Sequence, residues 1–87
     1  MDMSKKQVKK KYDKETTLHL KQLGKRLQQL RIQKGFTNYE YFAYEHNIGR
    51  AQYGSYENGS NIQFDTLLKL IKIHKISIKN FFSEGFD

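Results

Sequence analysis

The apolar residues at positions 18–33 recur with the period of one helical face, and this repeat constrains the fold more than any other feature. Spacings of three and four residues place four side chains on one side of an α-helix, namely Leu20, Leu23, Leu27 and Leu30. Polar residues fill the opposite side, at Lys21, Lys25, Arg26 and Gln29. We therefore predict a long amphipathic helix that Thr16 or Thr17 caps and Gly35 ends.

Asparagine and glycine residues divide the next segment into two short helices. Asn38 is a favourable N-cap for a helix that runs to about Glu45, and Asn47 tolerates the left-handed backbone that ends it. Gly49 opens a third helix, at about residues 49–58, which Gly59 closes. We predict that each short helix turns two residues toward the core: Phe42 and Ala43 from the first, Tyr53 and Tyr56 from the second.

Two further helices complete the predicted fold. Ser60 or Asn61 caps the fourth, and Ser77 caps a last helix that carries Ile78, Phe81 and Phe82. The fourth helix has a broad apolar face formed by Phe64, Leu67, Leu68, Leu70, Ile71 and His74. No segment alternates convincingly with the period of two that marks a strand. The pattern indicates an all-α fold, a compact bundle of about five helices.

The chain is strongly basic, with 16 lysine and arginine residues against 9 aspartate and glutamate residues and a formal charge of +7. Residues 1–17 are rich in lysine and offer few apolar groups. We predict a basic arm there, either disordered or a helix extension, and a folded domain at residues 18–87. The charge favours a polyanionic partner.

Several classes of protein are excluded by what the sequence lacks. It has no cysteine for disulfides or thiolate metal sites, and no apolar run approaches the roughly 18 residues that span a bilayer. His19, His46 and His74 lie far apart without a metal-binding motif, and neither Ser55 nor Ser77 has an adjacent histidine. We expect no catalytic residue, metal, cofactor or membrane contact and, without a secretory signal, a cytoplasmic location.

The second and third predicted helices form a short pair with a tight turn, a geometry that can hold one helix in a DNA major groove about 12 Å wide. The residues in and around this pair resemble the lambda-repressor-like helix-turn-helix family, the Cro/xenobiotic-response-element type of transcriptional regulator. The resemblance covers about residues 18–82 and is carried by residues 24–31, 35–36, 38–43, 48–50, 56–59, 64–70 and 76–82. Residues 39–43, 53–59 and 81–86 are also similar to a small single-domain subgroup found in Bacteroidetes-type bacteria.

Three positions depart from the family pattern. Residues 36–38 carry one residue more than most members have between the first two helices, which leaves the start of the second helix open. Asn47 and Lys75 stand where glycine is common. Asparagine tolerates the left-handed conformation better than most residues do, whereas Lys75 indicates a different cap after the fourth helix.

The resemblance implies three base-reading residues on the third helix: Arg50, Ala51 and Ser55. The planar guanidinium of Arg50 suits guanine O6 and N7, although a phosphate contact is the alternative. Ala51 can touch a thymine methyl group or simply allow a close approach, and Ser55 can donate or accept. Gly54 either lets the helix lie deep in the groove or serves packing.

The resemblance also implies contacts to the DNA backbone, which set the register without reading sequence. They fall on Tyr39 and on Gln52, which can reach a phosphate or a neighbouring base. The loop after the third helix, with Asn58, Ser60 and Asn61, offers free amides that can hold a phosphate. A partly buried ring is the alternative role for Tyr39. Arg31 and Glu57 match a structural ion pair that locks the third helix to the first.

These residues predict sequence-specific binding of double-stranded DNA by a small transcriptional repressor, at the nucleoid when bound. One short recognition helix covers few base pairs, so the resemblance implies a homodimer on a palindromic operator. Phe81, Phe82 and Phe86 are the candidate dimer patch. The alternative is an antitoxin or adaptor whose main ligand is a partner protein, with DNA binding for autoregulation. An RNA-binding basic protein is a third possibility.

Overall fold

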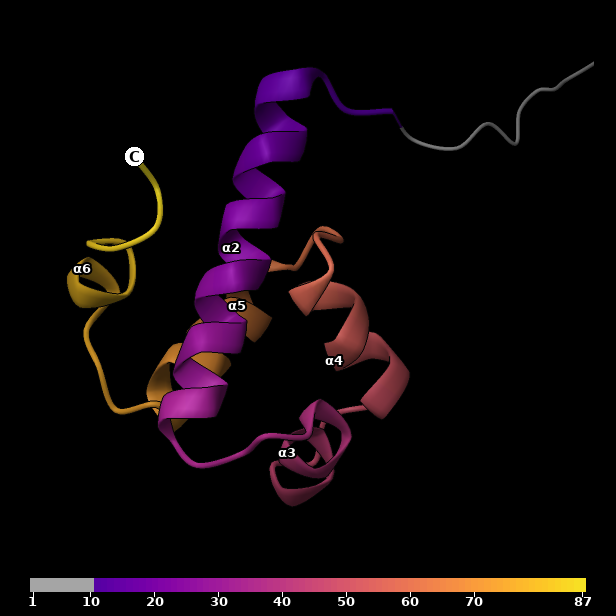
Figure 1. The fold of residues 1–87 in the computed structure, drawn as a ribbon, viewed down its shortest axis with the longest axis vertical. Coiled ribbons are helices and arrows are strands. Elements are labelled where there is room, and N and C mark those ends of the chain that lie inside the picture. Colours follow the sequence, from indigo (N-terminus) through magenta and orange to yellow (C-terminus); the bar gives the residue numbers. More distant parts are fainter. Residues whose placement is uncertain (1–10) are drawn as a thin grey trace, which may run out of the picture.

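The computed structural model describes residues 11–87, in which helices are joined by short turns (Figure 1). The helices are α2 (Lys14–Gln33), α3 (Tyr39–Glu45), α4 (Arg50–Glu57), α5 (Phe64–Ile73) and α6 (Ile78–Phe81). No strand occurs in this part of the chain. The predicted all-α bundle of about five helices is confirmed. None of the described helices is long and apolar enough to cross a membrane.

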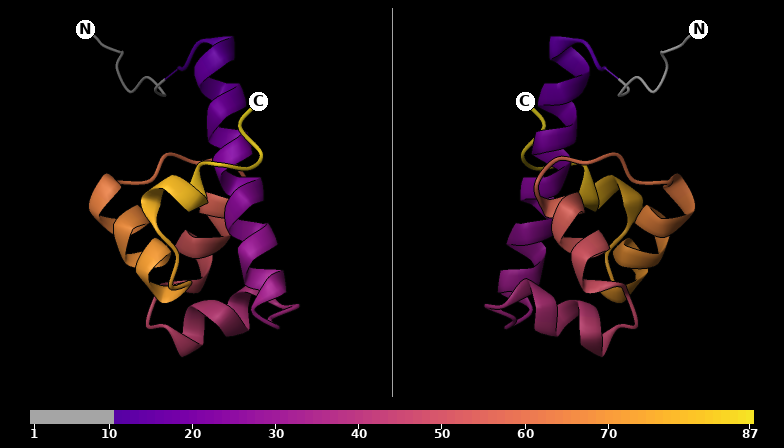
Figure 2. Two further views of the ribbon diagram at one scale, coloured as in Figure 1. Left: turned by 90° about the vertical axis from the view of Figure 1, so that its left-hand side faces the viewer. Right: turned by 90° about the vertical axis from the view of Figure 1, so that its right-hand side faces the viewer.

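Helix α2 runs through the middle of the molecule (Figure 1). Helices α3 and α4 pack against it on one side, and α6 lies on the other. The N-terminal part of α2 extends beyond the other helices, with the C-terminal end of the chain beside it (Figure 2). Helix α2 is therefore the scaffold against which α3, α4 and α6 lie.

Helix α2 begins earlier than the leucine repeat predicts. Asp13 is its N-cap, and the Asp13 carboxylate accepts a hydrogen bond from the Thr16 backbone N–H at 2.7 Å. This bond lowers the pKa of Asp13. The predicted caps Thr16 and Thr17 are wrong because both lie inside the helix. Residues 14–17 of the predicted arm are thus a helix extension, whereas residues 1–10 lie outside the described part.

The turns between helices follow the asparagine and glycine pattern. Asn38 caps α3 by accepting a hydrogen bond from the Tyr41 backbone N–H at 3.0 Å, so the extra residue in the preceding loop does not move the predicted start. Asn47 has a φ of 59° and Gly59 a φ of 100°. Lys75 also adopts a left-handed φ, of 57°. The backbone after α5 therefore makes the turn that a glycine would make, and the expectation of a different cap there is wrong.

The N-cap of helix α5 (Phe64–Ile73) lies two residues after the later of its two predicted caps. Gln63 occupies the N-cap position, so Ser60 and Asn61 are not caps. The residues before α5 bring Ile62 into the core with 9% of its surface exposed. Phe64 is 59% exposed because it is the first residue of the helix, and the predicted apolar face starts one turn later.

The core contains the four residues predicted to turn inward from the short helices. Phe42, Ala43 and Tyr53 are fully buried and Tyr56 is nearly so. Phe81 is fully buried as well, from the helix that Ser77 caps as predicted. Because Phe81 is part of this core, it is not available to the predicted dimer patch.

Phe42 lies at the centre of an aromatic cluster. Its ring centroid is 4.6 to 5.5 Å from those of Phe36, His46, Tyr53 and His74. His74 stacks on Phe42 with an interplanar angle of 4°, as expected for a core histidine. The Nε2 atoms of both histidines are buried and have no hydrogen-bond partner among the described residues. Burial lowers the pKa of His46 and lowers that of His74 to about 4, so both are neutral near pH 7.

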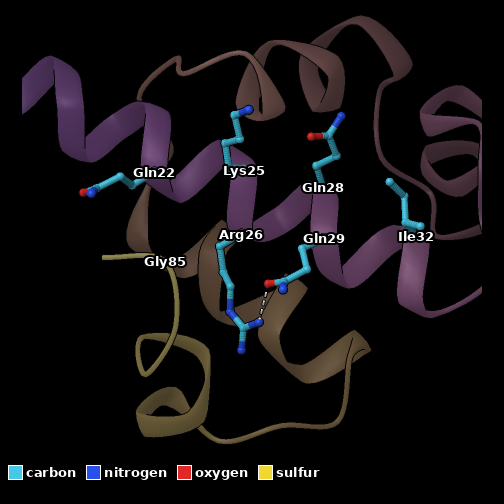
Figure 3. Close-up of a pocket in the computed structure, with 7 residues that line it drawn as sticks. All are labelled: Gln22, Lys25, Arg26, Gln28, Gln29, Ile32 and Gly85. Atoms are coloured by element: carbon cyan, nitrogen blue, oxygen red, sulfur yellow. Dashed lines mark hydrogen bonds between the residues drawn. The ribbon is translucent and has the colours of Figure 1, made fainter. Parts of the chain in front are cut away.

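Arg26 is buried, with 4% of its surface exposed, which contradicts its predicted place on the polar side of the long helix. Its guanidinium reaches the end of α6, where Nε donates to the Phe81 carbonyl at 2.7 Å and Nη2 to the Asn80 carbonyl at 3.0 Å. Nη1 donates to Gln29 Oε1 at 2.7 Å (Figure 3). The last carbonyls of a helix need partners from outside it, and a guanidinium can satisfy two of them. Arg26 thus fixes α6 to α2.

Candidate nucleic-acid interface

Helices α3 and α4 form a helix-turn-helix, joined by residues 46–49. The Ile48 N–H donates to the Ala43 carbonyl at 2.8 Å, and the Tyr53 N–H donates to the Gly49 carbonyl at 2.8 Å. Backbone bonds therefore hold the turn from both helices. The rings of Phe42 and Tyr53 join the two helices in the core, with centroids 5.1 Å apart. The pair is a rigid unit that presents α4 at the surface.

Helix α4 approaches α2 so closely that only glycine fits between them. A Cβ at Gly24 would lie 2.5 Å from the carbonyl oxygen of Glu57 and 2.6 Å from that of Tyr56. Backbone atoms cannot move aside as a flexible side chain can. Gly24 therefore fixes the distance between the scaffold helix and the C-terminal end of α4.

Arg31 and Glu57 form the ion pair that the resemblance implies. Nε lies 2.8 Å from Oε2 and Nη2 lies 3.0 Å from Oε1, and the two side chains are 5% and 7% exposed. The third nitrogen, Nη1, donates to the Phe36 carbonyl at 2.7 Å. The hydrogen bond to Glu57 raises the pKa of Arg31, and burial raises that of the neighbouring Tyr53 hydroxyl. The bidentate pair locks α4 to α2 and leaves neither charge free to meet a ligand.

The residues of α4 that are predicted to contact DNA, as base readers or backbone contacts, share its outward side. Arg50, Ala51 and Gln52 are exposed, and Ser55 is half-buried. Arg50 is the first residue of the helix and makes no hydrogen bond or ion pair within residues 11–87. The N-terminal end of α4 therefore carries an unpaired guanidinium at the surface.

Ser55 makes a hydrogen bond inside its own helix. Its hydroxyl donates to the Gln52 carbonyl at 2.7 Å. In this arrangement the hydroxyl proton is occupied, and only the oxygen lone pairs face outward. Ser55 thus suits a base that offers an amino group, adenine N6 or cytosine N4.

Tyr39 and Gly54 lie against each other across the two helices of the pair. Tyr39 is 38% exposed, and its ring covers Gly54, which is buried. The Tyr39 ring is partly buried against Gly54, and its phosphate contact stays a prediction. Gly54 faces this ring, so the interpretation that it lets α4 lie deep in the groove is wrong.

The loop after α4 brings three predicted backbone-contact residues together at the surface. Asn58, Ser60 and Asn61 are all exposed. Lys21 of α2 also lies here, with its Cγ 3.2 Å from where a Cβ of Gly59 would be. The sequence did not indicate Lys21, because its neighbour Gly59 lies far along the chain and no local pattern predicts such a contact. Its stem covers the loop and adds a positive charge beside it.

An apolar hollow lies between the first half of α2 and the C-terminal segment. It is lined by Thr16, His19, Leu20, Leu23, Phe82 and Phe86. Phe82 is 41% exposed and Phe86 is half-buried. Two of the three residues of the predicted dimer patch are therefore accessible, and the fully buried Phe81 is the wrong member.

No three histidine, aspartate or glutamate side chains in the described part of the chain lie close enough together to hold a metal ion. His46 and His74 are the C-caps of α3 and α5 and meet around Phe42, but a zinc site needs at least three protein ligands. Their environment is that of core residues.

The short pair of helices, with α4 locked at one end and exposed along its outward side, defines a helix-turn-helix DNA-binding domain. A family model described as helix-turn-helix matches residues 27–81, from within α2 to the end of α6. The chain therefore belongs to the lambda-repressor-like, Cro/xenobiotic-response-element type of helix-turn-helix family, whose members are DNA-binding transcription regulators. No curated protein and no solved structure matched the chain. The smaller Bacteroidetes-type subgroup stays a prediction.

Proposed function

We propose that this protein binds double-stranded DNA sequence-specifically, with α4 as the recognition helix in the major groove. The observation that carries the proposal is the contrast between the two ends of α4. Glu57 at one end is locked to α2, whereas Arg50 at the other is exposed and unpaired within the described residues. A helix held in this way loses little freedom when its free end meets base edges.

Each outward residue of α4 has a chemical role in this proposal. Arg50 pairs with guanine O6 and N7, a contact worth about 1–3 kcal/mol of discrimination. Ala51 contacts a thymine methyl group, and Ser55 accepts from a base amino group while its proton is held by Gln52. Sequence choice would therefore rest mainly on Arg50.

Residues around α4 would hold the phosphates on either side of the groove. They are Tyr39, Gln52, Asn58, Ser60 and Asn61, and the position of Lys21 beside the same loop adds it to the set. Contacts of this kind fix the orientation of the domain on the duplex without reading sequence. The lysine adds an ionic contact, which displaces a counterion from the DNA.

The protein would act as a homodimer on a palindromic operator, because a helix of two turns covers few base pairs. The interface we propose is the apolar hollow with Leu20, Leu23, Phe82 and Phe86. To read a palindromic operator, a two-fold pairing through this hollow has to place two recognition helices about one turn of DNA apart. A dimer bound across a promoter would exclude RNA polymerase, so we propose that the protein is a repressor. It would act at the nucleoid, in the cytoplasm.

The lysines of residues 1–10 lie outside the described residues, and we propose that they add affinity without specificity. Deletion of residues 1–12 leaves the Asp13 cap of α2 in place. We expect a shallower dependence of binding on salt, since each ionic phosphate contact contributes about 0.9 to the slope of log K against log salt. An unchanged slope would show that the arm is not on the DNA.

Selection of duplexes from a random pool by the full chain tests the proposed function. We expect an enriched, two-fold symmetric motif with half-sites about 10 base pairs apart. An enriched motif without symmetry would contradict the homodimer, and no enrichment would contradict sequence-specific binding. Competition with structured RNA belongs in the same experiment, because tighter, salt-resistant binding to RNA would overturn the assignment to DNA.

A further inference from the structure

Gly54 occupies the interior of α4, where glycine is less favourable than alanine. Its φ is not in the left-handed region, so the backbone does not require glycine here. The space does. A Cβ at Gly54 would lie 2.5 Å from Tyr39 Cε1, 3.0 Å from Cζ and 3.2 Å from the hydroxyl oxygen. The edge of the phenol ring, from Cε1 to the hydroxyl, therefore occupies the place of the missing side chain.

Tyr39 reaches this place from the other helix of the pair. It is the first residue of α3, and the side-chain hydrogen bond of Asn38 fixes the start of that helix. One edge of the ring rests on Gly54, yet 38% of the residue is exposed. Its hydroxyl makes no hydrogen bond within residues 11–87.

We propose that Gly54 is a positioning residue: it provides the space that holds the Tyr39 hydroxyl against the recognition helix, in place to donate to a DNA phosphate. This inference rests on the proposed DNA binding by α4. Gly54 lies about one helical turn from Arg50. The packing of the Tyr39 ring on Gly54 then fixes the position of the phosphate contact from α3 relative to the base contact of Arg50 from α4.

The binding test uses the full chain, a duplex carrying the selected motif and a random duplex of equal length. Tyr39→Phe removes only the hydroxyl and keeps the packing on Gly54. We expect it to weaken binding to both duplexes by the same factor, about three- to tenfold. The salt dependence should stay unchanged, because a neutral hydroxyl displaces no counterion.

Gly54→Ala should push the ring away and cause a similar loss while Tyr39 is present. Added to Tyr39→Phe, it should cause no further loss, because the hydroxyl is already gone. Losses that multiply in the double variant would show that the two residues act independently and would overturn the proposal. Wild-type affinity for Tyr39→Phe would also overturn it, leaving Tyr39 as a packing residue alone.

Thermal unfolding without DNA tests the packing separately. Gly54→Ala should raise Tm more in the Tyr39→Ala background, where the new methyl group meets no ring and alanine favours the helix, than in the wild-type chain, where the ring must first move aside. An equal change of Tm for Gly54→Ala in the two backgrounds would contradict the contact.

The two proposals fail differently. If wild-type protein binds the selected and random duplexes equally, the proposed sequence-specific function is wrong. If the wild type prefers the selected duplex but Tyr39→Phe binds as well as the wild type, only the role of Gly54 and Tyr39 is wrong.

Discussion

Helix α2 carries two buried arginines, Arg26 and Arg31, that fasten opposite parts of the molecule by different chemistry. Both are 4% exposed. Arg31 meets the carboxylate of Glu57 and holds α4, the proposed recognition helix. Arg26 meets the backbone carbonyls of residues 80 and 81 and holds α6. The Arg31 attachment is an ion pair between two charged side chains. The Arg26 attachment joins one charged side chain to the backbone carbonyls at the end of α6.

The difference decides how each attachment can be broken. The partner of Arg31 can be removed by mutation, which leaves an uncompensated buried charge. The carbonyls that accept from Arg26 cannot be removed, and its nearest carboxylate, Glu84, is 3.7 Å away and 60% exposed. A pair exposed to this extent contributes little. The Arg31 attachment should therefore be the more sensitive to single substitutions.

The largest expected effect follows the loss of one member of the buried pair. Arg31→Ala or Glu57→Ala should lower the free energy of unfolding by about 3–5 kcal/mol, because each leaves the other charge buried and unpaired. Urea unfolding measures the loss. The matched control is the double variant Arg31→Met with Glu57→Leu, which we expect to unfold near the wild-type midpoint. A double variant as unstable as either single variant would contradict this account of the pair.

Substitution of the other arginine should have a smaller and more local effect. Arg26→Ala should lower the free energy of unfolding by about 2 kcal/mol, since charge-assisted hydrogen bonds to two carbonyls are lost. Amide exchange should accelerate in residues 78–87 and change little in α4. Arg26→Lys should recover only part of the loss, because an ammonium lacks the planar fork. Equal acceleration in both regions would show that Arg26 does not act locally.

The smallest effect is a pH dependence that belongs to neither arginine. The folded pKa of His74 is about 4, below its ordinary value of 6.5, because the ring is buried neutral. The unfolded chain takes up a proton first, so the stability is fully present above about pH 6.5 and is lost as the pH falls toward 4. Tm should fall between pH 7 and 5, and less so in His74→Phe. An identical fall in that variant would exclude His74 as the cause.

The local signals in the sequence were enough to predict the helix-turn-helix pair. Asn38, Asn47 and Gly59 act on their own turns, so their residue types alone indicate where helices begin and end. The Arg31–Glu57 pair came from the family resemblance, because the two residues are 26 positions apart. Arg50 and Ala51 are exposed, and the base-reading set stays a prediction.

What the sequence could not predict are contacts between distant residues that leave no local mark. Arg26 stands among polar residues in the sequence. Its partners are backbone carbonyls, which every residue has, so no residue type in the sequence indicates that Arg26 is buried and paired. Gly54 needs the ring of Tyr39, 15 positions earlier, to explain its missing side chain. The sequence predicts Phe81 as part of an exposed dimer patch, but it is fully buried because α6 packs on the core. These side chains acquire their roles only when the helices pack.

The proposed recognition by α4 is tested most directly with Arg50→Ala, by measuring affinity for the selected duplex and for a random duplex of equal length. The account predicts a loss of about 1–3 kcal/mol per half-site on the selected duplex and a much smaller loss on the random one. The control Lys79→Ala removes one positive charge from α6. It should weaken binding to the two duplexes equally and only slightly. Equal loss on the two duplexes for Arg50→Ala would show that Arg50 grips phosphate and does not read bases.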